Sequence, residues 1–259
     1  DECYHLAASS FVSYTFDEEL STFNNNVQST HYLLAALKEH AISCRTYFAG
    51  TSEMFGRVTS EPQDEITPFN PRSIYGISKL SGYHLAQNYR EINNMFICTG
   101  ILYNHESPRR GFEFVTRKIT STVAKIKLGI EKKLYLGNLN AVRDWGYAPE
   151  YVKAMWLMLQ QNEPDDYVIA TGELHSVRQF VDYAFKCVGL DYKEYVVIDP
   201  QFYRESEKVP LRGDSSKAYR TFGWKSQKKL EEIIYEMIAH DMALITKNQT
   251  KRCKNEVAL

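Results

Sequence analysis

Short apolar runs that alternate with stretches of helical periodicity are the feature that most constrains the fold of this chain. Such alternation is typical of a sheet of parallel strands whose connections are helices. The sequence therefore predicts an α/β protein with a doubly wound parallel sheet. The expected strands are CYHLAAS (3–9), CRTYFAG (44–50), MFICTGIL (95–102) and DYVIATG (166–172), and the expected helices are 27–40, 75–93, 115–128, 150–161, 176–188 and 228–245.

Length and composition narrow the class of protein further. The chain has 259 residues and is 44% hydrophobic, which suits one large domain or a domain with a smaller companion. A formal net charge of -1 provides no field that would attract nucleic acid or an anionic membrane. The five cysteines are scattered, which favours a reducing compartment, and no apolar run is long enough to span a membrane. Without a leader pattern, the expected location is the cytoplasm.

The expected sheet lacks the loop that usually binds a dinucleotide. Such sheets normally open with a strand, a glycine-rich turn and a helix whose N-terminus holds the pyrophosphate. None of the 13 glycines forms a GxxGxxG or GxGxxG pattern after a strand near the start. Two explanations stay open at this point: a fragment of a longer protein, or a protein that has lost that half.

The segment YGISK carries the sharpest local signal. Tyr75 and Lys79 are one helical turn apart and would share a face of the 75–93 helix. An ammonium group beside a phenol favours the phenolate and lowers the pKa of the tyrosine, which makes Tyr75 a candidate acid/base. YxxxK alone is a weak pattern, because any amphipathic helix that contains tyrosine can show it by chance.

A second signal follows the 44–50 strand, at the carboxyl end where open α/β sheets place their sites. Thr51 and Glu53 occupy positions i and i+2, which project to the same side if the segment is extended. The hydroxyl would polarise a sugar oxygen, and the carboxylate would take a proton from carbon. The alternative is that these residues only cap a turn.

Several segments together resemble the GDP-mannose 4,6-dehydratases of the extended short-chain dehydrogenase/reductase superfamily. The resemblance runs from about residue 1 to about residue 246 and includes TSEMFG, PRSIYGISK, ILYNHESPRRG, FVTRKI, LGNLNAVRDWG and DYVIATG. The combination NHESPRRG, TRKI and RDWG is much more specific than YxxxK. The resemblance implies a Rossmann-like sheet that begins at the family's fourth strand.

The resemblance also implies roles for individual residues. Thr51, Glu53 and Tyr75 match the family's catalytic residues, and Lys79 matches the lysine that holds the nicotinamide ribose and tunes the tyrosine. The implied cofactor is NADP, and the positions that match its contacts are Leu6, Ala7, Ala8, Ser10, Lys79, His105 and Arg110. Ser21 aligns where the family often has a tyrosine, which is a departure at one cofactor contact. A satisfied structural histidine is the alternative for His105.

Four further residues match positions that hold the nucleotide-sugar in related dehydratases: Asn104, Lys118, Arg143 and Arg204. Lysine and arginine suit a diphosphate because they form charge-assisted hydrogen bonds. A structural ion pair with Asp144 is an equally good explanation for Arg143. The remaining histidines show no metal-ligand spacing, so no metal is expected.

The implied substrate is GDP-mannose, and the implied product is GDP-4-keto-6-deoxymannose, formed by oxidation at C4, loss of water across C5–C6 and hydride return to C6. Two alternatives stay open: a non-catalytic remnant that binds the sugar-nucleotide, and a 4-reductase or epimerase on the same scaffold. The carboxylate of Glu53 favours dehydration, because neither 4-reduction nor epimerisation needs a base at C5. A homodimer or homotetramer is expected, as the family usually pairs the helix that bears the tyrosine.

The same resemblance implies a division of the chain. Residues 1–103 are expected to form the second half of the NADP-binding domain. Residues 104–246 are expected to form a smaller α/β substrate-binding region, with a return to the sheet around 140–171. Residues 247–259 are expected to be a polar tail.

Overall fold

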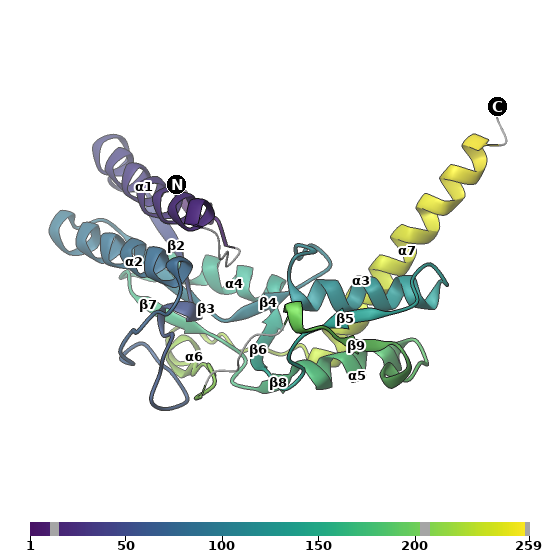
Figure 1. The fold of residues 1–259 in the computed structure, drawn as a ribbon. Coiled ribbons are helices and arrows are strands. Elements are labelled where there is room, and N and C mark those ends of the chain that lie inside the picture. The colour runs from purple at the N-terminus through teal and green to yellow at the C-terminus, as the bar shows by residue number, and fades with distance from the viewer. Residues whose placement is uncertain (11–15, 203–207, 257–259) are drawn as a thin grey trace. The chain divides into compact units, whose positions relative to one another are not determined.

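A computed structural model describes residues 1–10, 16–202 and 208–256 of the chain (Figure 1). The chain divides into two compact units, and it passes between them several times. Unit 1 consists of Asp1–His105, Asp144–Glu173 and Glu207–Ser226. Unit 2 consists of Glu106–Arg143, Leu174–Ser206 and Gln227–Leu259.

Unit 1 is built on a 4-stranded parallel sheet in the order β1-β2-β3-β7. Its strands are β1 (Glu2–His5), β2 (Arg45–Thr51), β3 (Ile97–Leu102) and β7 (Asp166–Ile169). Parallel strands need helical crossovers, and the sequence between each pair of neighbouring strands supplies them. The predicted α/β fold with a doubly wound parallel sheet is confirmed.

Helices cover both faces of this sheet, because successive side chains of each strand point to opposite faces. Phe48 of β2 packs into a core with Leu34 of α1 and Tyr83 of α2, whereas its neighbour Tyr47 packs into a second core with Met155 of α4. The helices of the first face are α1 (Phe16–His40) and α2 (Ile74–Asn93), and those of the second are α4 (Ala148–Leu159) and α6 (Ser216–Phe222).

Strand β1 differs from the buried strand that its apolar residues predict. It lies at the edge of the sheet, with β2 as its partner, and only His5 of its residues is buried. Tyr4 keeps 36% of its surface exposed, and Leu6, directly after the strand, keeps 54%. An apolar sequence cannot by itself show whether a strand lies in the centre or at the edge of a sheet.

Helix boundaries follow capping residues where the sequence has them. Ser73 caps α2 by accepting a hydrogen bond from the Gly76 N–H at 3.0 Å, and Ser176 forms a capping box with Gln179 at the start of α5 (Val177–Cys187). Helix α1 begins at Phe16, well before the predicted start at residue 27. Phe16, Leu20 and Phe23 stand at helical spacing in its first turns, but three asparagines (24–26), which have low helix propensity, separate them from the apolar run that follows.

Unit 2 is formed mainly by helices. Helix α3 (Val115–Lys127), α5 and α7 (Leu230–Glu256) pack against one another, and the short parallel strands β5 (Leu134–Leu136) and β9 (Val196–Ile198) form a 2-stranded sheet. A buried ion pair between Arg117 and Asp241 joins α3 to α7. Helix α7 continues beyond the predicted end at residue 245, where its apolar periodicity stops.

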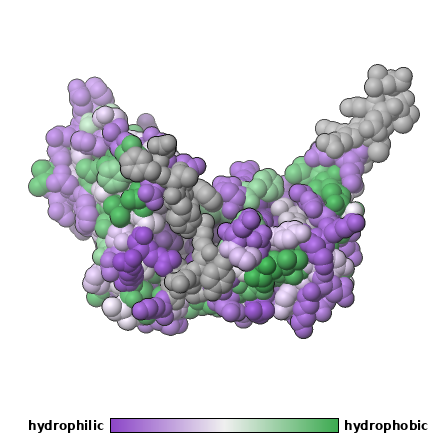
Figure 2. Space-filling view, viewed as in Figure 1, coloured by the Kyte–Doolittle hydropathy of each residue, from purple (hydrophilic) through white to green (hydrophobic). Residues whose placement is uncertain are grey.

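The remaining elements are short. They are η1 (Ser52–Met54), β4 (Asn104–Glu106), β6 (Val142–Tyr147), β8 (Leu174–Ser176), η2 (Tyr192–Glu194) and η3 (Pro200–Phe202). In the view of Figure 2, hydrophilic side chains occupy most of the described surface, and hydrophobic side chains form separate patches. Within the described ranges, no helix combines the length and the hydropathy needed to cross a bilayer.

Candidate active site

The candidate catalytic residues Thr51 and Glu53 lie where β2 ends, at the carboxyl edge of the sheet. Thr51 is the last residue of the strand, and Glu53 lies in the 3-10 helix η1 that follows. The expected extended geometry for this pair is therefore wrong. Instead, the Thr51 Oγ1 accepts a hydrogen bond from the Glu53 N–H at 3.3 Å. Thr51 thus caps η1, and its own hydroxyl proton stays available for a further acceptor.

Helix α2, which carries Tyr75 and Lys79, starts next to η1, the segment that carries Glu53. The helix begins directly against η1: a Cβ built on Gly76 would lie 2.7 Å from the main-chain oxygen of Glu53. Only a residue without a side chain permits this approach, so glycine at 76 sets how closely the two elements pack. The main chain of Glu53 and the first turn of the helix that carries Tyr75 are therefore in direct contact.

Lys79 is buried in this arrangement, with 5% of its surface exposed. Its Nζ lies 4.9 Å from the centroid of the Phe48 ring. Burial lowers the pKa of Lys79 to about 8, because the charged form loses its hydration. Burial and the charge of Lys79 also lower the pKa of His5, at the end of β1. The Lys79 ammonium group therefore loses its proton, and with it its charge, near pH 8.

The segment after β1, which contains Leu6, Ala7, Ala8 and Ser10, is held by Asn26 of α1. The Ser9 N–H donates to the Asn26 Oδ1 at 2.8 Å, and the Asn26 Nδ2 donates to the Ser9 main-chain oxygen at 3.1 Å. The same Nδ2 lies 3.0 Å from the Ser78 Oγ, which donates to the main-chain oxygen of Tyr75 at 2.8 Å. One buried amide thus links the candidate cofactor segment to the helix of Tyr75.

His105 lies in β4, directly after Tyr103 and Asn104. Its Nδ1 is 2.8 Å from the main-chain oxygen of Tyr103, and its ring stacks on Tyr151 with centroids 4.9 Å apart. A carbonyl oxygen can only accept, so Nδ1 carries the proton in this contact and Nε2 is left as an acceptor in the neutral ring.

Arg110 belongs to unit 2. Its Nε lies 3.4 Å from the Glu106 Oε2, and its guanidinium group lies 3.7 Å from the centroid of the Phe114 ring. Glu106 is almost fully buried, and burial raises the pKa of its carboxyl group. The nearby cation and a hydrogen bond donated by the Thr116 hydroxyl at 2.5 Å act against this rise. Contacts with the Glu106 carboxylate and with the Phe114 ring therefore hold the Arg110 side chain in one orientation.

The candidate substrate residues lie in different parts of the chain. The Lys118 Nζ of α3 lies 3.6 Å from the centroid of the Phe202 ring, and burial lowers the pKa of Lys118. The Arg143 Nη1 donates to the main-chain oxygen of Val142 at 2.7 Å. Arg204 lies outside the described residues, so the structure adds nothing to its interpretation.

Asp144, the partner offered for Arg143 in the ion-pair explanation, accepts several hydrogen bonds from the segment after β7. Its Oδ1 accepts hydrogen bonds from the Thr171 N–H at 2.9 Å and the Thr171 hydroxyl at 2.6 Å, and its Oδ2 accepts one from the Gly172 N–H at 2.9 Å. Both explanations for Arg143 therefore stay open. The role of Arg143 in substrate binding stays a prediction.

A family model described as GDP-mannose 4,6 dehydratase matches residues 1–237 of the chain. This protein belongs to the GDP-mannose 4,6-dehydratase family. The resemblance noted in the sequence is thereby confirmed.

Individual relatives agree with the family model. GDP-mannose 4,6 dehydratase 2 of Arabidopsis thaliana is 50% identical over 250 residues, which cover 94% of this chain and 66% of the relative. GDP-mannose 4,6 dehydratase of Homo sapiens is 45% identical, with 95% of this chain and 72% of the relative covered. The chain thus spans about two thirds of the length of the curated relatives that it matches.

Solved structures confirm the fold class. The structure of RMD from Pseudomonas aeruginosa, described as complexed with NADPH, superposes with a TM-score of 0.85 at 21% identity. It covers 94% of this chain, which itself covers 82% of that structure. A UDP-glucose 4-epimerase from Thermotoga maritima gives a TM-score of 0.84 at 22% identity and covers 94% of this chain and 78% of its own. At this identity the likeness shows the fold alone.

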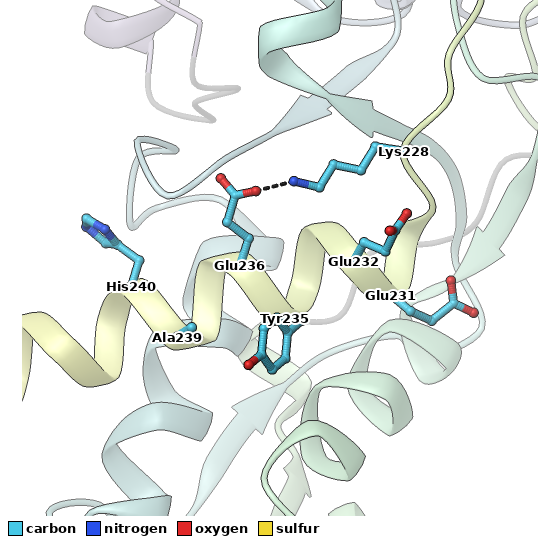
Figure 3. Close-up of a pocket in the computed structure, with 7 residues that line it drawn as sticks. All are labelled: Lys228, Glu231, Glu232, Tyr235, Glu236, Ala239 and His240. Carbon is cyan, nitrogen blue, oxygen red and sulfur yellow. Dashed lines mark hydrogen bonds and ion pairs between the residues drawn. The ribbon is translucent and has the colours of Figure 1, made fainter.

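An open depression lies along α7, and none of the described candidate site residues lines it. It is lined by Lys228, Glu231, Glu232, Tyr235, Glu236, Ala239 and His240 (Figure 3). Glu236 points toward Lys228, with which it forms an ion pair. In the ranges that the structure describes, no group of three or more His, Cys, Asp or Glu side chains is placed to hold a metal ion.

Sequence reasoning missed two buried residues of the site in this dehydratase-family chain, Asn26 and Ser78. Asn26 stands in a run of asparagines within α1, and nothing in the sequence distinguishes it from its neighbours. Ser78 lies inside YGISK. The signal that could have identified it is a polar residue on the apolar side of the predicted helix. Their roles depend on a contact between α1 and α2 that the local sequence does not specify.

Proposed function

We propose that this protein converts GDP-mannose to GDP-4-keto-6-deoxymannose. The observation that carries the proposal is the packing of Gly76 against the main-chain oxygen of Glu53, which brings a carboxylate-bearing segment to the helix of Tyr75 and Lys79. Membership of the family supports it, as do relatives named GDP-mannose 4,6 dehydratase at 42–50% identity. A base beside the tyrosine favours dehydration over reduction or epimerisation, which need no base at C5.

NADP is the cofactor we propose, and the residues present fit it. Leu6, Ala7, Ala8 and Ser10 follow the end of β1, at the edge where open parallel sheets bind nucleotides, and Asn26 fixes their backbone through Ser9. The Lys79 ammonium suits a ribose hydroxyl, and the Arg110 guanidinium suits a phosphate. When bound, NADP supplies hydride removal at C4 and hydride return at C6.

Tyr75 acts on the C4 hydroxyl group of the mannose ring. As a phenolate it accepts the hydroxyl proton while the C4–H bond breaks, which leaves a ketone at C4. Lys79, one helical turn away, favours the phenolate by its charge. Since burial brings the pKa of Lys79 to about 8, this support weakens once the pH exceeds that value.

Glu53 and Thr51 carry the elimination step. The C4 ketone acidifies the C5 hydrogen, because the electron pair released at C5 delocalises into the carbonyl group. Glu53 accepts the C5 proton, and the C6 hydroxyl leaves as water with a proton from Glu53 or from the Thr51 hydroxyl. One water is lost, and the double bond formed between C5 and C6 then accepts the returning hydride at C6 and a proton at C5, which completes the 4-keto-6-deoxy sugar.

The nucleotide-sugar residues stay as the resemblance assigns them: Asn104, Lys118, Arg143 and Arg204. Lys118 and the arginines suit a diphosphate, and His105 together with Arg110 suits the cofactor. We further infer a cytoplasmic homodimer or homotetramer that associates through α2. Light scattering of the purified protein tests the association, and a monomer at all concentrations would contradict it.

Mass spectrometry of the nucleotide-sugar tests the proposed reaction. The purified protein is incubated with GDP-mannose and NADP⁺, and the expected product has lost one water and contains a ketone. An epimer of unchanged mass would instead indicate epimerase chemistry. Binding of GDP-mannose without conversion would indicate a non-catalytic remnant.

A further inference from the structure

His105 is held by two contacts of different kinds. Its Nδ1 lies 2.8 Å from the main-chain oxygen of Tyr103, and its ring stacks on Tyr151 with centroids 4.9 Å apart and 25° between the planes. The hydrogen bond alone would let the imidazole ring swing about the line that joins the two bonded atoms. The stack on Tyr151 removes that freedom, so the two contacts together fix both the direction and the plane of the ring.

Tyr151, in the first turn of α4, is itself held in one position. It has 0% of its surface exposed, and its ring meets that of Trp224 edge to face, with centroids 5.7 Å apart and 89° between the planes. A Cβ built on Gly146 of β6 would lie 2.4 Å from the Tyr151 ring, so a residue without a side chain is what lets the ring lie this close to the strand. The ring is therefore enclosed by His105, Trp224 and the main chain of Gly146.

Trp224 anchors this arrangement to the start of α4. Its Nε1 donates to the main-chain oxygen of Glu150 at 2.8 Å, and the Ser226 hydroxyl donates to the Glu150 Oε2 at 3.1 Å. A buried indole whose N–H is bonded has little freedom to move. Trp224, Tyr151 and His105 all belong to unit 1, and we call these three rings the aromatic stack.

Exposure rises along the aromatic stack, from the core toward the candidate site. Trp224 and Tyr151 are buried, whereas His105 is half-buried. His105 comes three residues after the end of β3, at the edge where open parallel sheets bind nucleotides. Because Tyr151 has no exposed surface, it cannot contact a ligand itself. Its effect on a ligand must pass through a neighbour, and His105 is the member of the aromatic stack that has exposed surface.

We propose that Tyr151 is a positioning residue for cofactor binding, which acts by fixing the plane of the His105 ring. The inference rests on the proposed function, in which His105 suits the cofactor, and it names the residue that orients this contact. A ring that is already held in one plane loses less conformational freedom on binding than a mobile ring does, so its contact with a ligand is stronger.

Calorimetric titration of the purified protein with NADP⁺ tests the proposal. Tyr151→Leu removes the stacking ring and is expected to weaken binding by about three- to tenfold. Tyr151→Phe keeps the ring and should restore binding to within about twofold of the wild type. A Tyr151→Phe variant as weak as Tyr151→Leu would overturn the proposal.

Tyr167→Leu is the matched control for lost packing. It makes the same substitution in the same core, but the Tyr167 ring packs edge to face on Phe222. This variant should bind NADP⁺ within about twofold of the wild type. If Tyr167→Leu weakened binding as much as Tyr151→Leu, the effect would be general destabilisation and the proposal would fall.

A double-mutant cycle shows whether Tyr151 acts through His105. His105→Ala removes the ring that Tyr151 is proposed to orient, so adding Tyr151→Leu to it should weaken NADP⁺ binding little further. Additive effects of the two substitutions would mean that Tyr151 acts by another route.

Proton NMR of the His105 ring provides a readout that does not depend on cofactor binding. The ring signals are assigned by their absence from His105→Ala. Because the His105 ring lies on the face of Tyr151, its protons should resonate upfield of those of free histidine in the wild type and in Tyr151→Phe, and return toward them in Tyr151→Leu. Unshifted signals in the wild type would overturn the proposal even if Tyr151→Leu did not fold. A wild type that binds no NADP⁺ would refute the proposed cofactor, and the ring-proton shifts would still decide whether Tyr151 orients His105.

Discussion

The main-chain oxygen of Glu53 and the Cα of Gly76 approach so closely that a Cβ at residue 76 would lie 2.7 Å from that oxygen. This contact fixes η1 against the first turn of α2. It therefore sets the spacing between the segment that carries Thr51 and Glu53 and the helix that carries Tyr75 and Lys79. The proposed chemistry depends on that spacing, because the tyrosine and the glutamate act on adjacent carbons of one sugar ring.

Gly76→Ala is expected to lower kcat by about tenfold or more, because the added methyl group must push η1 and α2 apart and small displacements of reacting groups are costly. Folding should suffer less, since alanine is the better helix former. Steady-state kinetics and thermal unfolding measure the two effects. Ser81→Ala on the same helix is the control, and a normal kcat in Gly76→Ala would show that the contact does not set the site.

Glu53→Gln is expected to stop the reaction after the first oxidation. Tyr75 can still accept the C4 hydroxyl proton, but no carboxylate is present to take the C5 proton. Absorbance of the reduced nicotinamide should rise on addition of GDP-mannose, and no 6-deoxy product should follow. If the variant made the 4-keto-6-deoxy sugar at the normal rate, the base would have to be another residue.

Lys79→Met is expected to stabilise the fold at neutral pH while it lowers activity. The pKa of Lys79 falls from 10.5 to about 8 on folding, so below pH 8 the folded state carries a buried charge. Between about pH 8 and 10.5 the unfolded chain binds more protons, and the wild type gains stability as the pH rises. The gain from methionine should be about 2–4 kcal/mol at pH 7 and vanish above about pH 10.5.

Urea unfolding of Lys79→Met and wild type at several pH values measures this difference. Lys127→Met, at an exposed position of α3, is the control and should change stability little at any pH. A Lys79→Met variant that is less stable than wild type at pH 7 would mean that the lysine is held by interactions stronger than its burial cost.

Asp241→Ala is expected to destabilise unit 2 by about 3–5 kcal/mol, because it leaves the Arg117 charge buried without its partner. Both side chains of this pair are only 3% exposed. The control is Asp182→Ala, which breaks the exposed Lys186 pair on the surface of α5 and should cost far less stability. Denaturant unfolding checks both, and equal losses would contradict the assigned difference in burial.

The sequence predicts the parts of this fold that local chemistry determines. The helix of Tyr75 has a serine cap and regular apolar spacing, so its bounds were found closely, and the apolar runs located the central strands. The prediction misses the start of α1, because three asparagines (24–26) of low helix propensity interrupt its apolar spacing. The geometry of Glu53 was wrong, because the 3-10 turn of η1 has no pattern of its own.

Residues whose roles depend on distant contacts were not visible in the sequence. Asn26 is a polar residue in polar surroundings along the chain, and only folding places it among buried partners. The family motifs identified the candidate reacting groups, since those occur in short fixed patterns. They do not identify the residues that hold the reacting groups in place, because each such contact joins segments far apart in sequence.

The most direct test of the proposed function follows one hydrogen atom. GDP-mannose that carries deuterium at C4 is incubated with the protein and NADP⁺, and the position of the label in the product is determined by NMR. The proposed reaction moves the deuterium from C4 to C6 within one active site, so the 4-keto-6-deoxy product should retain it at C6. A product that keeps the label at C4, or one that has lost it to free cofactor or solvent, would contradict the proposed function.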